Sequence, residues 1–235
     1  MIHQQIAILW LGFTNMEIGI NLSISRPFAI VEPSSLLTDL ASYYKLEDLV
    51  DSHGANTLTN TNSVTFTSGK LNNAATFDGT NNLNALTFDF SSGEFTISFW
   101  AKITGASQTL MGTLGVCMDF YLDGNNVDFY LYSGAGWQNI KNNANINDGV
   151  WHHIVGKVSN NVQSIIVDNG TPATTVWSSG VADTIVLPGK YQGGSTEYHV
   201  GQLDEMGFWN RGLTSEEITT LFNNGTPPPY PFIGL

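Results

Sequence analysis

The sequence of 235 residues has little charge, little cysteine and few basic residues. Charged residues make up 12%, about half of the usual share. Cys117 is the only cysteine, which excludes an internal disulfide. Lysine and arginine number 8 against 20 aspartates and glutamates, for a net charge of −12. This balance argues against nucleic acid and anionic membrane surfaces as partners, and it is compatible with divalent cations and neutral glycans.

Long hydrophobic runs are also missing. The stretch IAILWLGF (Ile6–Phe13) is too short to span a bilayer, and it lacks the basic region and the cleavage site of a signal peptide. We therefore expect no membrane span and no signal peptide. The residues that follow alternate, with one apolar face formed by Ile18, Ile20, Leu22 and Ile24. This pattern predicts an extended arm, which packs on a partner surface or on its own domain.

Motifs for nucleophilic, metal-dependent or cofactor-dependent catalysis are absent: the chain contains no G-x-S-x-G, Walker loop, H-E-x-x-H or C-x-x-C. We expect Cys117 to be a buried hydrophobic residue. Glycoside hydrolysis needs two carboxylates that face each other across the bond. Asp204 and Glu205 are adjacent in a predicted strand, so their side chains point to opposite faces. We therefore predict no catalytic residues and a protein that is not an enzyme.

The chain instead is rich in glycine, with 24 residues, and in short alternating segments. In Glu94–Ile103 one face is apolar and consists of Phe95, Ile97, Phe99 and Ala101. The segment VQSIIVDNG ends in a hairpin turn signal. Short strands separated by turns predict an all-β sandwich of two antiparallel sheets. One short helix is expected at residues 214–223, where Thr214 and Glu217 form a capping box.

Prolines divide the sequence into three parts. Residues 1–35 are expected to form an N-terminal arm and linker, which ends in the proline-containing stretch SRPFAIVEPSS. Residues 36–225 form the predicted sandwich domain. Residues 226–235 form a proline-rich tail, which is either a second docking segment or a cap on the sandwich.

Aromatic side chains stack on the apolar faces of sugars, and neighbouring polar groups bind the hydroxyls. The best candidates for exposed glycan-binding residues lie beside predicted turns: Trp137, Trp177 and Tyr191. Three other tryptophans lie in well-patterned strands and are expected in the core: Trp100, Trp151 and Trp209.

Five motifs in order resemble the laminin-G-like, concanavalin A-like lectin/glucanase jelly roll over about residues 36–225. They are LASYYKLED…DSHGANTLT, NAATFDGTNN, FTISFWAKI, DGVWHHIVGKV…VDNG and GQLDEMGFWNRGLTSEEI. The resemblance implies two antiparallel sheets packed face to face, one of them concave. It is informative about the fold and says little about function.

The resemblance also implies a structural calcium ion. In related glucanases, the aspartate of the final-strand motif helps to hold calcium together with backbone carbonyls, and Asp204 occupies that place here. Asp78 and Asp51 would supply further oxygen ligands. The alternative is that these carboxylates satisfy buried or turn backbone groups. The catalytic strand of the glucanases is missing, so their activity does not carry over.

Similar domains are frequent in bacteriophage structural proteins, and the opening LLTDLASYYKLED…DSHGANTLT is similar to theirs. The resemblance implies a virion structural or decoration protein on the particle exterior. Such a protein would attach to other virion proteins through its arm, form a homo-oligomer or part of a larger assembly, and bind glycans or stabilise the shell. The initial Met1, the lack of a signal peptide and the lack of disulfides agree with assembly inside a cell.

Two alternatives remain from other functional classes. One is a free carbohydrate-binding module or bacterial surface adhesin, located outside the cell or at its surface. The other, less favoured because the carboxylate pair is missing, is a glycoside hydrolase or lyase.

Overall fold

A computed structural model describes residues 35–85, 87–177, 184–192 and 197–233 of the chain. Residues 1–34 of the expected arm lie outside these ranges. Within them, no helix is long and apolar enough to cross a membrane.

Antiparallel strands are the main regular structure of the described chain, as expected for an all-β protein. The strands are β1 (Leu40–Tyr44), β2 (Thr59–Thr61), β3 (Thr65–Ser68), β4 (Asn73–Asp78), β5 (Asn82–Asn84), β6 (Thr87–Phe88), β7 (Phe95–Ile103), β8 (Gln108–Thr113), β9 (Met118–Asp123), β10 (Asn126–Tyr132), β11 (Trp137–Asn142), β12 (Trp151–Ser159), β13 (Val162–Val167), β14 (Ala173–Val176), β15 (Thr184–Pro188) and β16 (Val200–Trp209). The helical elements are α1 (Ser215–Phe222) and the 3₁₀ helices η1 (Ser35–Leu37) and η2 (Asn223–Gly225).

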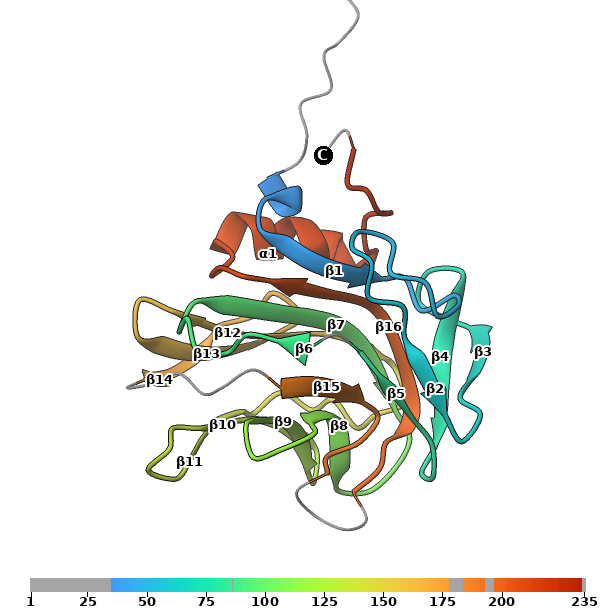
Figure 1. Cartoon of the computed structure of the whole chain (residues 1–235), viewed down its shortest axis with the longest axis horizontal. Coiled ribbons are helices and arrows are strands. Elements are labelled where there is room, and N and C mark those ends of the chain that lie inside the picture. Colours follow the sequence, from blue (N-terminus) through green and yellow to red (C-terminus); the bar gives the residue numbers. More distant parts are fainter. Residues whose placement is uncertain (1–34, 86, 178–183, 193–196, 234–235) are drawn as a thin grey trace, which may run out of the picture. The chain divides into compact units, whose positions relative to one another are not determined.

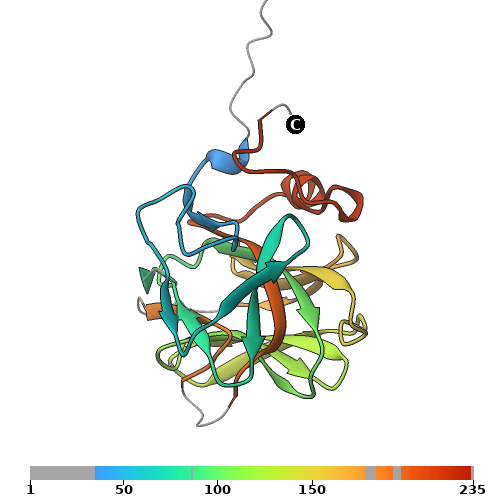
Figure 2. The same cartoon turned by 90° about the vertical axis from the view of Figure 1, so that its right-hand side faces the viewer.

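Two large sheets pack face to face, which confirms the predicted jelly-roll sandwich (Figure 1). The eight-stranded sheet has the order β14-β13-β12-β7-β16-β4-β3, and β1 also pairs with β16. The six-stranded sheet has the order β11-β10-β9-β8-β15-β6. Helix α1 covers the outer face of the eight-stranded sheet, and the outer face of the six-stranded sheet is on the opposite side of the molecule (Figures 1 and 2).

Alternation along the central strands builds the core between the sheets. The apolar face expected for β7 is confirmed, since Phe95, Ile97, Phe99 and Ala101 are all at most 1% exposed. From the other sheet, Phe120 and Phe129 stack with their ring centroids 4.5 Å apart. The predicted hairpin turn is also confirmed: Asp168 and Asn169 both have positive φ, and they connect the paired strands β13 and β14.

A β-bulge in β16 explains the adjacent acids Asp204 and Glu205. On one edge, β16 pairs with β4 up to Leu203 and with β1 from Met206 onward. The bulge lies at this change of partner, where Glu205 takes the left-handed conformation with φ of 47°. The carboxylate of Asp204 accepts backbone hydrogen bonds from Lys70, Leu71 and Glu205, at 2.8 to 3.0 Å. Its visible role is therefore to satisfy backbone groups at the bulge and in the turn between β3 and β4.

The side chain of Glu205 has a different partner, Tyr43, which belongs to the apolar cluster beneath helix α1. One of its oxygens accepts a short hydrogen bond from the hydroxyl of Tyr43 in β1. Its other oxygen is buried and has no hydrogen-bond partner among the described residues. Burial raises the pKa of Asp204 to about 7 and the pKa of Glu205 to about 8.

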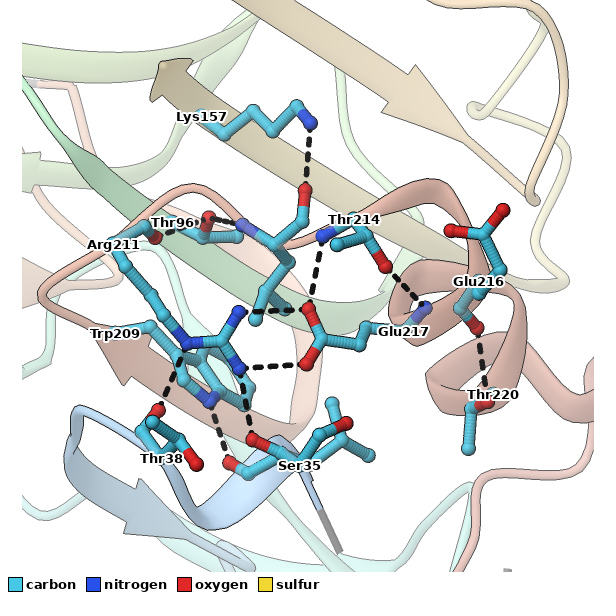
Figure 3. A network of polar contacts seen from close by, with 12 residues as sticks. Ser35, Thr38, Thr96, Lys157, Trp209, Arg211, Thr214, Glu216, Glu217 and Thr220 are labelled. Atoms are coloured by element: carbon cyan, nitrogen blue, oxygen red, sulfur yellow. Dashed lines mark hydrogen bonds and ion pairs between the residues drawn. The ribbon is translucent and has the colours of Figure 1, made fainter. Parts of the chain in front are cut away.

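The predicted helix is confirmed as α1, with Thr214 as its N-cap and both hydrogen bonds of the capping box present. Arg211 joins this helix to the start of the described chain (Figure 3). Its guanidinium group binds both oxygens of Glu217 at 2.7 Å and donates to the carbonyls of Ser35 and Thr38. The position at which the chain enters the domain is thus held by charge-assisted hydrogen bonds.

The described part of the proline-rich tail packs on the same end of the domain. Phe232 is 1% exposed and belongs to a small apolar cluster between β1 and α1. The ring of Tyr230 stacks on Tyr43, with centroids 5.1 Å apart. Residues 226–233 therefore cover this edge of the sandwich.

Candidate aromatic binding site

A pocket of about 280 Å³ opens on the outer face of the six-stranded sheet. We call it the aromatic pocket and define it by its lining residues: Asp119, Tyr121, Tyr130, Trp137, Tyr191 and Glu197. Strands β9, β10 and β11 supply the first four, and the segments around 191 and 197 follow β15.

Strand alternation and register bring these side chains to one face. In β9, Met118, Phe120 and Leu122 point into the core, so Asp119 and Tyr121 point outward. Asp119 of β9 lies directly opposite Tyr130 of β10. The next pair of strands has Tyr132 opposite Trp137. Aromatic side chains of neighbouring strands consequently lie side by side on the outer face.

Trp137 is the most exposed aromatic residue of the pocket, with 42% of its surface accessible. Three tyrosine rings approach it nearly edge-on, with centroid distances of 5.5 Å for Tyr132, 5.9 Å for Tyr191 and 6.2 Å for Tyr130. Such edge-to-face contacts are favourable between aromatic rings and hold the indole in place. The result is an open aromatic surface whose border carries tyrosine side chains.

Two carboxylates complete the pocket. Asp119 is only 7% exposed; one of its oxygens accepts a hydrogen bond from the Thr109 hydroxyl at 3.3 Å, and the other has no partner among the described residues. Burial raises the pKa of Asp119 well above its ordinary value, and the nearby charge of Glu197 raises it further. The pocket thus offers acceptors for a donor group of a ligand.

The structure brings two of the three predicted sugar-binding residues together. Trp137 is the first residue of β11, and Tyr191 follows β15 in a loop; both line the aromatic pocket. The expectation that Trp177 is exposed was wrong, because Trp177 is 2% exposed and belongs to the main core cluster. It directly follows the edge strand β14 and turns inward.

The other expectations about single side chains are mostly confirmed. Trp100 and Trp209 are buried at 2% and 0% exposure, and Cys117 is buried. Burial raises the pKa of the Cys117 thiol to about 12, in agreement with a packing role. Trp151 differs from the expectation, because it is partly exposed on β12.

The three expected calcium ligands do not form a common site. Among the described residues, no group of three or more histidine, cysteine, aspartate or glutamate side chains is arranged to hold a metal ion. Like Asp204, the other two accept hydrogen bonds from backbone N–H groups: Asp51 from Tyr43 and from residues 53, 54 and 56, and Asp78 from Thr80. Carboxylate oxygens that face N–H donors do not suit a cation. Calcium binding at Asp204 stays an untested implication of the family resemblance, and the contacts of Asp204 favour the alternative that its carboxylate satisfies backbone N–H groups.

A second hollow of about 360 Å³ lies on the eight-stranded sheet, away from the aromatic pocket. Six of its nine lining residues have polar side chains, among them Thr67, Gln202 and the single cation Lys102. No exposed tryptophan lines it. The aromatic pocket is therefore the better candidate for a sugar ring.

Comparison with known proteins identifies the fold. The family model Laminin_G_3, of the concanavalin A-like lectin/glucanases superfamily, matches residues 72–219. No protein of curated function matches the chain.

Among solved structures, domain 4 of AbnA, a GH43 extracellular arabinanase from Geobacillus stearothermophilus in complex with arabinotriose, is similar at 19% identity with a TM-score of 0.65. That match covers 78% of this chain and 98% of the other. The binding domain of Paraclostridial Mosquitocidal Protein 1 matches at 16% identity and a TM-score of 0.68, over 80% of this chain and 53% of that one.

The binding domain of botulinum neurotoxin DC in complex with SialylT matches at 13% identity and a TM-score of 0.65, over 81% of this chain and 52% of that one. The chain thus spans about half the length of the two toxin binding domains. At these identities the similarity concerns the fold.

Proposed function

The chain belongs to the concanavalin A-like lectin/glucanase superfamily, and we propose that it is a carbohydrate-binding protein whose ligand stacks on Trp137 in the aromatic pocket. The observation that carries this proposal is the exposed indole, held edge-on by three tyrosines and bordered by two carboxylates. Aromatic faces with a few convergent polar groups suit sugar rings, which have an apolar face and hydroxyl edges. The arabinotriose and SialylT complexes of the similar structures support the choice of oligosaccharides as probes.

A glycan array with the purified chain tests this proposal. We expect at least one oligosaccharide to bind, and Trp137→Ala to weaken that binding about tenfold or more, the equivalent of roughly 1.4 kcal/mol. Trp151→Ala is the matched control, since Trp151 is a partly exposed tryptophan on the other sheet. Equal affinity of wild type and Trp137→Ala would remove the aromatic pocket as the site.

We propose further that binding, without hydrolysis, is the function. The similar structures include receptor-binding and binding domains of toxins, which supports this reading. Asp119 and Glu197 nevertheless bring two carboxylates to one pocket, so hydrolysis must be measured directly. We expect no release of reducing sugar from bound oligosaccharides. Release that disappears in both Asp119→Asn and Glu197→Gln would identify a glycosidase instead.

We also propose that the domain is displayed on the exterior of a particle, attached through residues 1–34. Arg211 fixes the chain at Ser35 and Thr38, at the end of the domain opposite strands β9, β10 and β11 (Figures 1 and 2). Attachment at that end would direct the aromatic pocket away from the particle. Deletion of residues 2–34 is expected to abolish incorporation into virions, whereas unchanged incorporation would contradict the role of the arm.

A further inference from the structure

We infer that the aromatic pocket selects a glycan that carries a positively charged ammonium group, namely an amino sugar without an N-acetyl group. This inference rests on the proposed function, because it names the class of sugar that the same pocket would take.

The first argument is the charge of the pocket. Two of its six lining residues are acids, Asp119 and Glu197, and none is basic. The nearby lysines are engaged elsewhere: Lys141 pairs with Asp123 at 2.5 Å, and the ammonium group of Lys190 lies 5.1 Å from the ring centroid of Tyr198. A ligand cation would therefore meet two acids with no basic lining residue beside them, and its charge would favour the ionised form of Asp119, which burial otherwise disfavours.

The second argument is the buried oxygen of Asp119. This side chain is 93% buried, it lines the pocket, and one oxygen lacks a hydrogen-bond partner among the described residues. A buried acceptor without a donor is costly, and a charged donor offsets both the missing hydrogen bond and the carboxylate charge. An ammonium group offers three N–H donors, and it could reach Glu197 as well.

The third argument is the aromatic border. Cations are attracted to the faces of tryptophan and tyrosine, and organic ammonium groups are often recognised by several such rings together. The ring centroids of Tyr130 and Tyr191 lie 6.2 Å and 5.9 Å from that of Trp137, and the two acids line the same pocket. The net charge of −12 also attracts cationic ligands from solution.

The same features disfavour other sugars. An N-acetyl group removes the positive charge, and it leaves the two carboxylates uncompensated. A sialylated glycan would place a third carboxylate near Asp119 and Glu197, and like charges in a partly buried site repel. The pocket should therefore rank amino, neutral and acidic sugars in that order.

Calorimetric titration of the full chain tests the inference. The probes are a glucosamine tetrasaccharide, the N-acetylglucosamine tetrasaccharide and a sialylated trisaccharide, at a pH at which the free amine is charged. We expect the glucosamine tetrasaccharide to bind at least tenfold more tightly than the acetylated one. Glu197→Gln and Asp119→Asn should each reduce this preference severalfold. Asp123→Asn is the matched control, because Asp123 is an exposed acid that pairs with Lys141 outside the pocket.

The outcomes separate this inference from the proposed function. Equal or tighter binding of an acetylated or sialylated sugar, lost in Trp137→Ala, overturns the inference and leaves carbohydrate binding intact. Glucosamine binding that persists in Trp137→Ala is adsorption to an acidic surface, and it also overturns the inference. If Asp119→Asn lowers the melting temperature, Glu197→Gln at a partly exposed position still decides the question.

Discussion

The acids Asp204 and Glu205 illustrate what single residues do in this protein. Adjacent residues of a regular strand point to opposite faces, so a regular strand would not bring these two carboxylates together. A bulge at Glu205 interrupts the strand here, and the two side chains have different hydrogen-bond partners. Asp204 accepts hydrogen bonds from backbone N–H groups, and Glu205 accepts a hydrogen bond from the hydroxyl of Tyr43. Both carboxyls are at most 3% exposed. Their burial has a consequence for the pH dependence of stability.

Burial raises the pKa of Glu205 from 4.5 to about 8. The folded protein therefore holds this proton more tightly than the unfolded chain does, and the stability gained from it is present at low pH and lost as the pH rises through 8. We expect the melting temperature to fall between about pH 6.5 and pH 8, and to fall less in Glu205→Gln, which keeps a neutral side chain. Melting curves of both proteins across this range provide the check.

The pH range for this comparison begins at 6.5 because buried histidines change the stability below that pH. Burial lowers the pKa of His153 and His199 from 6.5 to about 4, so they add stability as the pH rises to 6.5 and nothing further above it. The hydrogen bond that His152 donates to Asp168 raises the pKa of His152, and burial raises the pKa of Asp204 to about 7; both groups act in the same direction as Glu205. The comparison with Glu205→Gln isolates the carboxyl. Parallel pH profiles of the two proteins would contradict a proton held by Glu205.

The candidate site was only partly predictable at this scale. Trp137 and Tyr191 were found because large aromatic residues beside turn signals are often exposed. Asp119 and Tyr130 were missed, because an outward residue in an alternating strand looks the same whether its neighbours form a pocket or a flat surface. Only the register between β9 and β10, which the sequence does not state, shows that these two residues are paired.

At the scale of elements, the strands that alternate clearly were predicted and those that carry irregularities were not. The pattern of β7 and the hairpin of β13 and β14 were both confirmed. The segment 84–90 contributes to two short strands, β5 and β6, which pair with β2 and β15 respectively. The bulge in β16 could not be predicted, because it lies where β1 replaces β4 as the partner, and the sequence does not show this pairing.

The contact between the sheets allows a prediction for Gly156 in β12. A Cβ atom at this position would lie 2.4 Å from the ring of Phe120, which is itself stacked on Phe129. We expect Gly156→Ala to destabilise the protein by about 1–3 kcal/mol, because an overpacked core must shift rigid rings. Gly115→Ala is the control, since its nearest neighbouring atom would be 3.6 Å away. Equal denaturation midpoints for the two variants would contradict the tight contact.

At the scale of the whole molecule, the question is whether the fold needs a metal ion. Asp204 is directed at backbone donors, so we expect calcium to leave the melting temperature of the full chain unchanged relative to chelator. A site filled at about 100 times its dissociation constant would add about 2.7 kcal/mol. A rise with calcium that is lost in Asp204→Asn would instead establish the ion expected from the family resemblance.

The central claim is that a sugar binds in the aromatic pocket, at the end of the molecule away from Ser35. The most direct test is a crystal structure of the chain with the strongest ligand from the array. The account predicts a sugar ring stacked on Trp137, with polar contacts to Asp119 or Glu197. A ligand bound at the polar hollow around Lys102 and Gln202, with the aromatic pocket empty, would contradict it.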